Sequence, residues 1–127
     1  MTLFVNVKGQ DQSIGRVEIP YEIVKAATAL RYAPERYFEV SEETKFISTH
    51  RLVLSRVRPK GIANAVKLMA LAFEGKHARR PPIQVSESED RSYVVIDGNS
   101  TAVIAIAAGW PDIPCTIAEP SLNKERA

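Results

Sequence analysis

The feature that most constrains the fold of this sequence is a strand that runs through an Asp-Gly turn into a helix. Tyr93-Val94-Val95-Ile96 is rich in aromatic and β-branched residues, a composition that predicts a strand. Asp97-Gly98-Asn99 interrupts this pattern, and the small and apolar residues from Ser100 to Ala108 predict a buried helix that Gly109 ends. A strand that leads directly into a helix indicates a domain that combines both kinds of element, so we expect an α+β (mixed α/β) class.

The start of this helix has the chemistry of an anion-binding site. The first N–H groups of a helix have no intrahelical partners, and the macrodipole adds partial positive charge there. Gly98 allows a sharp turn and leaves room for a phosphate, while Ser100 and Thr101 offer hydroxyl donors. Asp97 could orient the loop, hold a metal ion or act as a base. A plain turn followed by a helix N-cap explains the same residues, so both interpretations stand at this point.

Other parts of the chain show the periodicity of further elements. Apolar residues at helical spacing from Ala63 to Glu74, followed by Gly75, predict an amphipathic helix with a glycine cap. Short apolar or alternating runs bounded by Gly, Pro and polar residues predict strands. The remaining expected elements are a hairpin of Leu3–Val7 and Gly15–Ile19, a helix from Pro20 to Leu30, and strands at Arg36–Val40, Ile83–Val85 and Cys115–Ile117.

The composition places the chain among ordinary globular proteins of one domain. It has 127 residues, of which 45% are hydrophobic and 25% charged. The single cysteine, Cys115, excludes an internal disulfide and a multi-cysteine zinc site, and we expect it to be a small core residue. The apolar stretch from Thr101 to Trp110 is too short to span a bilayer, and residues 1–6 lack a basic signal-peptide region. We therefore expect a cytoplasmic protein.

The net charge of +2 is unevenly distributed. Eight basic residues and one acidic residue lie between Arg51 and Arg80, which gives this segment +7 and leaves −5 for the rest. Such asymmetry indicates a polyanionic partner, although a solvated basic surface explains it equally well. No element dedicated to reading base edges is evident, so any DNA binding is expected to be independent of sequence and sensitive to salt. The candidate DNA-binding residues are Arg51, Arg56, Arg79 and Arg80.

The order of motifs from Phe46 to Ile117 resembles the ParB/sulfiredoxin-like superfamily. The resemblance is carried by Pro82-Ile83-Gln84-Val85, by Val95-Ile96-Asp97-Gly98, and by an alanine-rich helix that leads through Gly109 to Ile113-Pro114. It implies a small mixed sheet with packed helices over residues 46–118, an N-terminal hairpin and helix extension over 1–45, and a polar tail over 119–127. The superfamily hosts several chemistries, so the resemblance is more specific for fold than for function.

The resemblance also implies a nucleotide site. It places the nucleotide phosphates at the start of the helix after Asp97, against Gly98, Asn99, Ser100 and Thr101, with Arg58 and Lys60 reaching them from an earlier loop. It also includes Asp97 in this phosphate loop. For phosphoryl transfer, Asp97 is the candidate catalytic residue, and a nucleoside triphosphate such as ATP or CTP with Mg²⁺ is the candidate ligand. The His-Arg pair that is usual in the superfamily is replaced by Ser100 and Thr101, which removes a phosphate clamp and an acid–base candidate. Sulfiredoxin activity is rejected, because Asn99 stands where its catalytic cysteine is required.

Two functions follow as hypotheses. The first is a nucleotide-binding domain with weak phosphohydrolase activity on nucleoside triphosphates or DNA, from a plasmid or another mobile element. The second is a non-catalytic regulatory module that binds DNA or a protein. Other candidates have simpler interpretations: we expect His50 and His77 at the surface without a metal, and Trp110 in a packing role.

Overall fold

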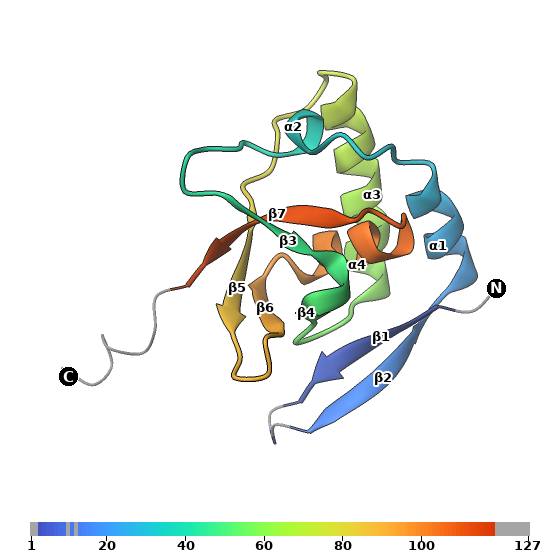
Figure 1. Ribbon diagram of the computed structural model, residues 1–127. Coiled ribbons are helices and arrows are strands. Elements are labelled where there is room, and N and C mark those ends of the chain that lie inside the picture. Colours follow the sequence, from blue (N-terminus) through green and yellow to red (C-terminus); the bar gives the residue numbers. More distant parts are fainter. Residues whose placement is uncertain (1–2, 10, 12, 119–127) are drawn as a thin grey trace.

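The computed structural model describes residues 3–9, 11 and 13–118 and has the expected mixed α+β class (Figure 1). The expected polar tail over 119–127 lies outside the described residues. Strands and helices alternate through most of the described chain. The elements are β1 (Leu3–Lys8), β2 (Ile14–Ile19), α1 (Tyr21–Thr28), α2 (Pro34–Tyr37), β3 (Lys45–Ser48), a 3₁₀ turn (Thr49–Arg51), β4 (Leu52–Val53), α3 (Pro59–Phe73), β5 (Ile83–Glu87), β6 (Tyr93–Asp97), α4 (Asn99–Ala107) and β7 (Asp112–Ile117).

The central sheet has five strands in the order β3-β7-β5-β6-β4. It is mixed, because β3–β7 and β5–β6 are antiparallel whereas β5–β7 and β4–β6 are parallel. The β1–β2 hairpin is a separate antiparallel pair, and β1 adjoins the β4 edge through a parallel bridge between Val7 and Leu54. Two backbone hydrogen bonds hold this bridge, from Lys8 N to Leu54 O at 2.8 Å and from Leu54 N to Asn6 O at 2.9 Å.

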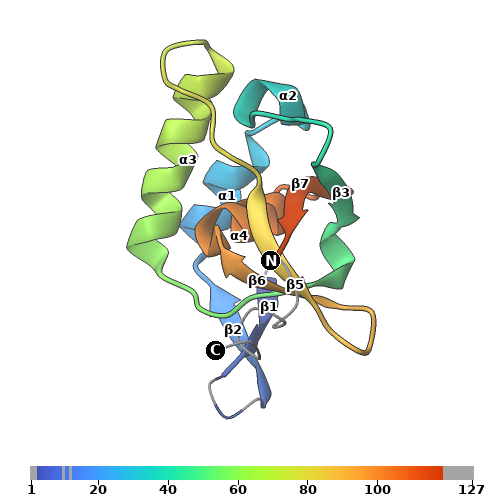
Figure 2. The ribbon, with the colours of Figure 1, turned by 90° about the vertical axis from the view of Figure 1, so that its left-hand side faces the viewer.

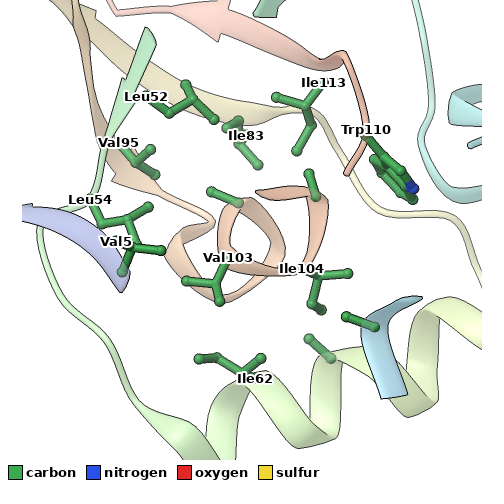
Figure 3. Packing of buried hydrophobic residues seen from close by; sticks show 14 of the residues in the cluster. Val5, Leu52, Leu54, Ile62, Ile83, Val95, Val103, Ile104, Trp110 and Ile113 are labelled. Atoms are coloured by element: carbon green, nitrogen blue, oxygen red, sulfur yellow. The ribbon is translucent and has the colours of Figure 1, made fainter. Parts of the chain in front are cut away.

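Helix α4 lies at the centre of the molecule, between the sheet and the other helices. Figure 3 shows it end-on, with Ile83 and Val95 of the sheet on one side and Ile62 of α3 on the other. Its residues from Ala102 to Ala105 are fully buried, so this helix has no polar face. A helix that is apolar on all sides is typical of one covered by protein in every direction, and small side chains allow its neighbours to approach closely.

The β1–β2 hairpin and helix α1 share the core of the sheet. Val5 and Ile19 of the hairpin are buried, as are Ile23 and Ala27 of α1, and all four belong to the same hydrophobic cluster as α4. Helix α1 packs against both α3 and α4. The residues outside the resemblance therefore bury apolar surface that the remaining elements would otherwise expose.

Two of the predicted elements are wrong in type or in extent. Arg36–Val40 is not a strand, because Pro34 occupies the first turn of α2 and its fixed φ favours a helix start. Tyr37 stacks on Trp110 with ring centroids 5.2 Å apart, a tertiary contact that holds this turn. Helix α3 begins at Pro59 rather than Ala63 for the same reason, so Lys60 lies in the first turn of the helix and not in a loop.

No helix among the described residues is long and apolar enough to cross a membrane.

Candidate functional site

The loop between β4 and α3 is fixed to the start of α4 by a pair of side-chain hydrogen bonds. Ser55 N donates to Asn99 Oδ1 at 2.9 Å, and Asn99 Nδ2 donates to Ser55 Oγ at 2.9 Å. Ser55 Oγ in turn donates to the carbonyl oxygen of Val95 at 2.7 Å. The chain thus leaves β4, passes the end of β6 and enters α3 along a defined path (Figure 2).

This path brings the N-termini of α3 and α4 together. A Cβ atom built on Gly61, in the first turn of α3, would lie 3.0 Å from Ser100 Oγ in the first turn of α4. Neither helix has a side-chain cap at its N-terminus. The first intrahelical donors are Ile62 N and Ala102 N, so the N–H groups that precede them in each helix point out of the helix end. Two sets of unsatisfied donors and two positive dipole ends therefore meet at one place.

Gly98 is required at this junction by the fold itself. Its φ is +98°, a left-handed conformation that side chains disfavour. A Cβ atom at this position would lie 2.6 Å from Ile83 Cγ2, which is closer than van der Waals contact allows. The glycine lets the end of β6 turn against β5, so its presence here does not by itself indicate a phosphate.

The four side chains between Asp97 and Thr101 divide into two groups. Asn99 is 6% exposed and Thr101 is 3% exposed, so both side chains belong to the interior and offer a ligand only their backbone N–H groups. Asp97 is exposed and Ser100 is half-buried, so their side chains remain accessible. Among the described residues, no hydrogen bond to the Asp97 carboxylate is formed by another side chain or by a loop N–H. Of the four donor residues expected from Gly98 to Thr101, two therefore have side chains that belong to the interior.

Arg58 and Lys60 flank the junction. Arg58 is the N-cap residue of α3 and Lys60 is the second residue of that helix, and both side chains are exposed. Within the part of the chain that the structure describes, the one ion pair joins Lys76 to Glu74, so neither cation is neutralised by a carboxylate. Arg58 and Lys60 thus lie near the start of α4, where a phosphate was expected from the sequence.

The structure does not gather the four candidate DNA-binding arginines into one surface. Arg51 Nε donates to the Arg91 carbonyl at 2.8 Å and its guanidinium lies 4.8 Å from the centre of the Tyr93 ring, at the start of β6. Arg56 lies instead in the loop that leads to α3. Arg79 Nη1 donates to the Glu35 carbonyl at 3.1 Å, and Arg80 pairs through its backbone with the α2 region, both beyond the far end of α3. That helix of 15 residues is about 22 Å long.

A broad groove lies between the β1–β2 hairpin and the antiparallel pair β5–β6. It was not identified from the sequence. Its volume is about 1100 Å³, and Val94 and Ile96 are among the residues that line it. Lys8 and Arg56 line it together with the acidic residues of the β5–β6 turn, so its charge is mixed. The Asp90 carboxylate in that turn accepts from Ser92 N and Oγ, which lowers its pKa. The groove therefore lacks the positive character of the helix junction, and no pattern in the sequence marked it.

The remaining candidates have structural roles. His50 and His77 are exposed, as expected, and no group of three or more His, Cys, Asp or Glu side chains in the described ranges could hold a metal ion. Cys115 is fully buried, which raises the pKa of its thiol to about 12. Trp110 is 2% exposed and its Nε1 donates to the Leu30 carbonyl at 3.2 Å, which confirms its packing role.

No family model matches the chain, and no curated protein is significantly similar to it.

Proposed function

We propose that the protein binds the phosphate groups of a nucleotide where the N-termini of α3 and α4 meet. The observation that carries this proposal is the contact between the first turns of these helices at Gly61 and Ser100, with no side-chain cap on either helix. Backbone N–H groups at a helix N-terminus favour phosphate through both hydrogen bonds and the helix dipole. Two such ends at one place offer a stronger site than either end alone.

The donors of the site come from both helices. From α4 they are the N–H groups of residues 99–101 and the Ser100 hydroxyl, and from α3 they are the N–H groups of Lys60 and Gly61. Pro59 has no N–H group, so its place in the first turn of α3 costs no donor. Arg58 and Lys60 add mobile positive charge, and hydrogen bonds between charged groups are shorter and stronger than neutral ones.

The resemblance to the ParB/sulfiredoxin-like superfamily supports the same location. It implies a phosphate site at the helix that follows the Asp97-Gly98 turn, which is the α4 end of this junction. We propose that the chain is a member of that superfamily, from a plasmid or another mobile element.

The proposed activity is nucleotide binding, with weak hydrolysis of the bound phosphate. Magnesium usually binds to one or two protein carboxylates together with the phosphates of its nucleotide, and the exposed Asp97 carboxylate fits that limited role. The same carboxylate is the candidate base for activating a water molecule. The arginine and histidine that are usual in the superfamily are absent, so little charge would be available to stabilise a transition state.

Calorimetric titration with ATP, CTP and pyrophosphate, each with and without Mg²⁺, tests the proposal. We expect at least one of these ligands to bind, and Lys60→Glu to weaken its affinity at least about tenfold, because a carboxylate would replace a cation at the phosphate. Lys67→Glu is the matched control, since it makes the same charge change on an exposed residue of α3 about two turns away. No binding by the parent protein, or equal loss in the two variants, would overturn the phosphate site.

A second function, non-specific binding of duplex DNA, is favoured by one surface. Helix α3 contains no acidic residue between Pro59 and Phe73, and its exposed residues include Lys60, Asn64 and Lys67, which follow one side of the helix. Such a row neutralises backbone phosphates without reading bases.

A further inference from the structure

We propose that two copies of this chain associate through the outer edge of β2, in an antiparallel pair with its two-fold axis at Val17. Within the described residues β2 pairs only with β1, and its first five residues are all exposed. The hairpin projects away from the helices, so this edge is open to another molecule (Figure 1). The inference is independent of the phosphate site.

The backbone bonds of β1 determine which groups of β2 point outward. Asn6 O and Lys8 N both bond to Leu54, so residues 6 and 8 direct their backbone groups away from β2. Backbone direction alternates along a strand, and residues 3, 5 and 7 of β1 therefore bond to β2. Their register partners are Ile19, Val17 and Gly15. The outward N–H and C=O groups of β2 consequently belong to residues 14, 16 and 18.

These outward residues select one register for a second copy. An axis at Val17 places Arg16 opposite the Glu18 position of the other strand, and Glu18 opposite its Arg16, in hydrogen-bonded pairs. An axis at residue 16 would oppose two arginines, and an axis at residue 18 would oppose two glutamates, and like charges directly opposite are unfavourable. Of these three registers, which the backbone allows alike, the one with its axis at Val17 is complementary in charge.

Exposed apolar side chains along the same edge gain cover in this arrangement. Val17 is 37% exposed and would meet its own copy at the axis, where opposing side chains approach closely. Ile14 is 55% exposed and would lie opposite Pro20 of the second copy, beside Tyr21, which is 56% exposed. No proline or bulge interrupts β2, so the edge lacks two of the devices that usually prevent strand pairing.

Analytical ultracentrifugation of the full chain, from about 1 µM to about 1 mM, measures the association. We expect the parent to shift from monomer to dimer across this range. Glu18→Arg and Arg16→Glu should each remain monomeric, and the double reversal Arg16→Glu with Glu18→Arg should restore the dimer. Glu42→Arg, on an exposed loop residue far along the chain, carries the same change in charge as Glu18→Arg and should dimerise like the parent.

A second variant tests the backbone pairing of the two edges. Glu18→Pro removes an outward N–H group that the monomer leaves to solvent, so the fold should tolerate it while the dimer loses two hydrogen bonds, one from each copy. Circular dichroism confirms that each variant is folded. A monomeric parent at every concentration, or single reversals that dimerise as strongly as the parent, would overturn the proposal. If the parent is monomeric at every concentration, the partner that remains for the β2 edge is an extended segment of a different protein.

Discussion

Asn99 binds Ser55 at both ends of its side-chain amide, with Oδ1 accepting from Ser55 N and Nδ2 donating to Ser55 Oγ, each at 2.9 Å. The two residues are 44 positions apart in the sequence and join the start of α4 to the loop that enters α3. This pair therefore determines how the two helix N-termini meet. The phosphate site that we propose depends on the Asn99 side chain for its shape, whereas the Asn99 backbone N–H is one of its donors.

Replacement of Asn99 by alanine should reduce both stability and phosphate affinity. The variant leaves Ser55 N without its acceptor in a partly buried position, which costs about 1–3 kcal/mol of unfolding free energy. Urea unfolding measures the stability and calorimetry the affinity. Asn64→Ala is the control, because Asn64 is exposed on α3. Equal stability of the two variants would contradict the anchoring role.

Replacement of Gly98 by alanine should destabilise the protein far more than the same change at Gly109. Both glycines have positive φ, +98° and +76°, so both variants carry the cost of a left-handed side chain, about 1 kcal/mol. Only the Cβ atom at position 98 meets a neighbour, Ile83 Cγ2 at 2.6 Å, whereas position 109 faces open space. Overpacking of this kind adds about 1–3 kcal/mol. Similar midpoints of urea unfolding for the two variants would show that Ile83 moves aside freely.

The salt dependence of DNA retention should identify α3 as the contact surface, if the protein binds DNA. Each phosphate contact contributes about −0.9 to the slope of log K against log salt concentration, so Lys60→Ala with Lys67→Ala should flatten it by nearly 2. Arg51→Ala is the control, because that guanidinium already contacts the Arg91 carbonyl and the Tyr93 ring. A larger change of slope for Arg51→Ala would place the DNA elsewhere.

Cys115 should make the protein less stable in alkaline solution. Burial raises the pKa of its thiol from 9.0 to about 12 in the folded state. Below pH 9 both states keep the proton, and between pH 9 and pH 12 only the unfolded chain loses it, so stability falls as pH rises. The slope approaches about 1.4 kcal/mol per pH unit. Urea unfolding from about pH 8 to about pH 11 should show a shallower decline for Cys115→Ala than for the parent.

The phenol of Tyr32 loses its proton in the same pH range as the Cys115 thiol. Tyr32 is present both in the parent and in Cys115→Ala. Its phenol donates a hydrogen bond to Asp112, and burial together with that contact raises its pKa to about 12. The comparison of parent and Cys115→Ala cancels this contribution. Identical pH dependence in the two proteins would mean that the thiol becomes accessible in the folded state.

The elements that local chemistry controls were predicted from the sequence. The β-branched run before Asp97 gave β6, and the small-residue segment that Gly109 ends gave α4, because strand propensity, turn chemistry and helix capping act within a few residues. The start of α3 was missed by four residues, although Pro59 at the first position of a helix is itself a local signal. Pro34 is the same kind of signal before the strand expected at Arg36–Val40, and there a non-local contact also acts, because Tyr37 packs on Trp110, which is 73 positions away in the chain.

The sequence by itself thus determined the mixed α+β class, the loop from Asp97 to Thr101 and the cations near it, since each is a property of neighbouring residues. Only the tertiary structure decided what those residues do. The side chains of Asn99 and Thr101 are buried in the interior. Gly98 packs so closely against Ile83 that no Cβ atom would fit, and Ser100 lies next to Gly61. The tertiary structure also separated the arginines that a charge count had grouped together. The physical reason is that burial, close packing and the meeting of two helix ends depend on residues far apart in the chain, which no local pattern encodes.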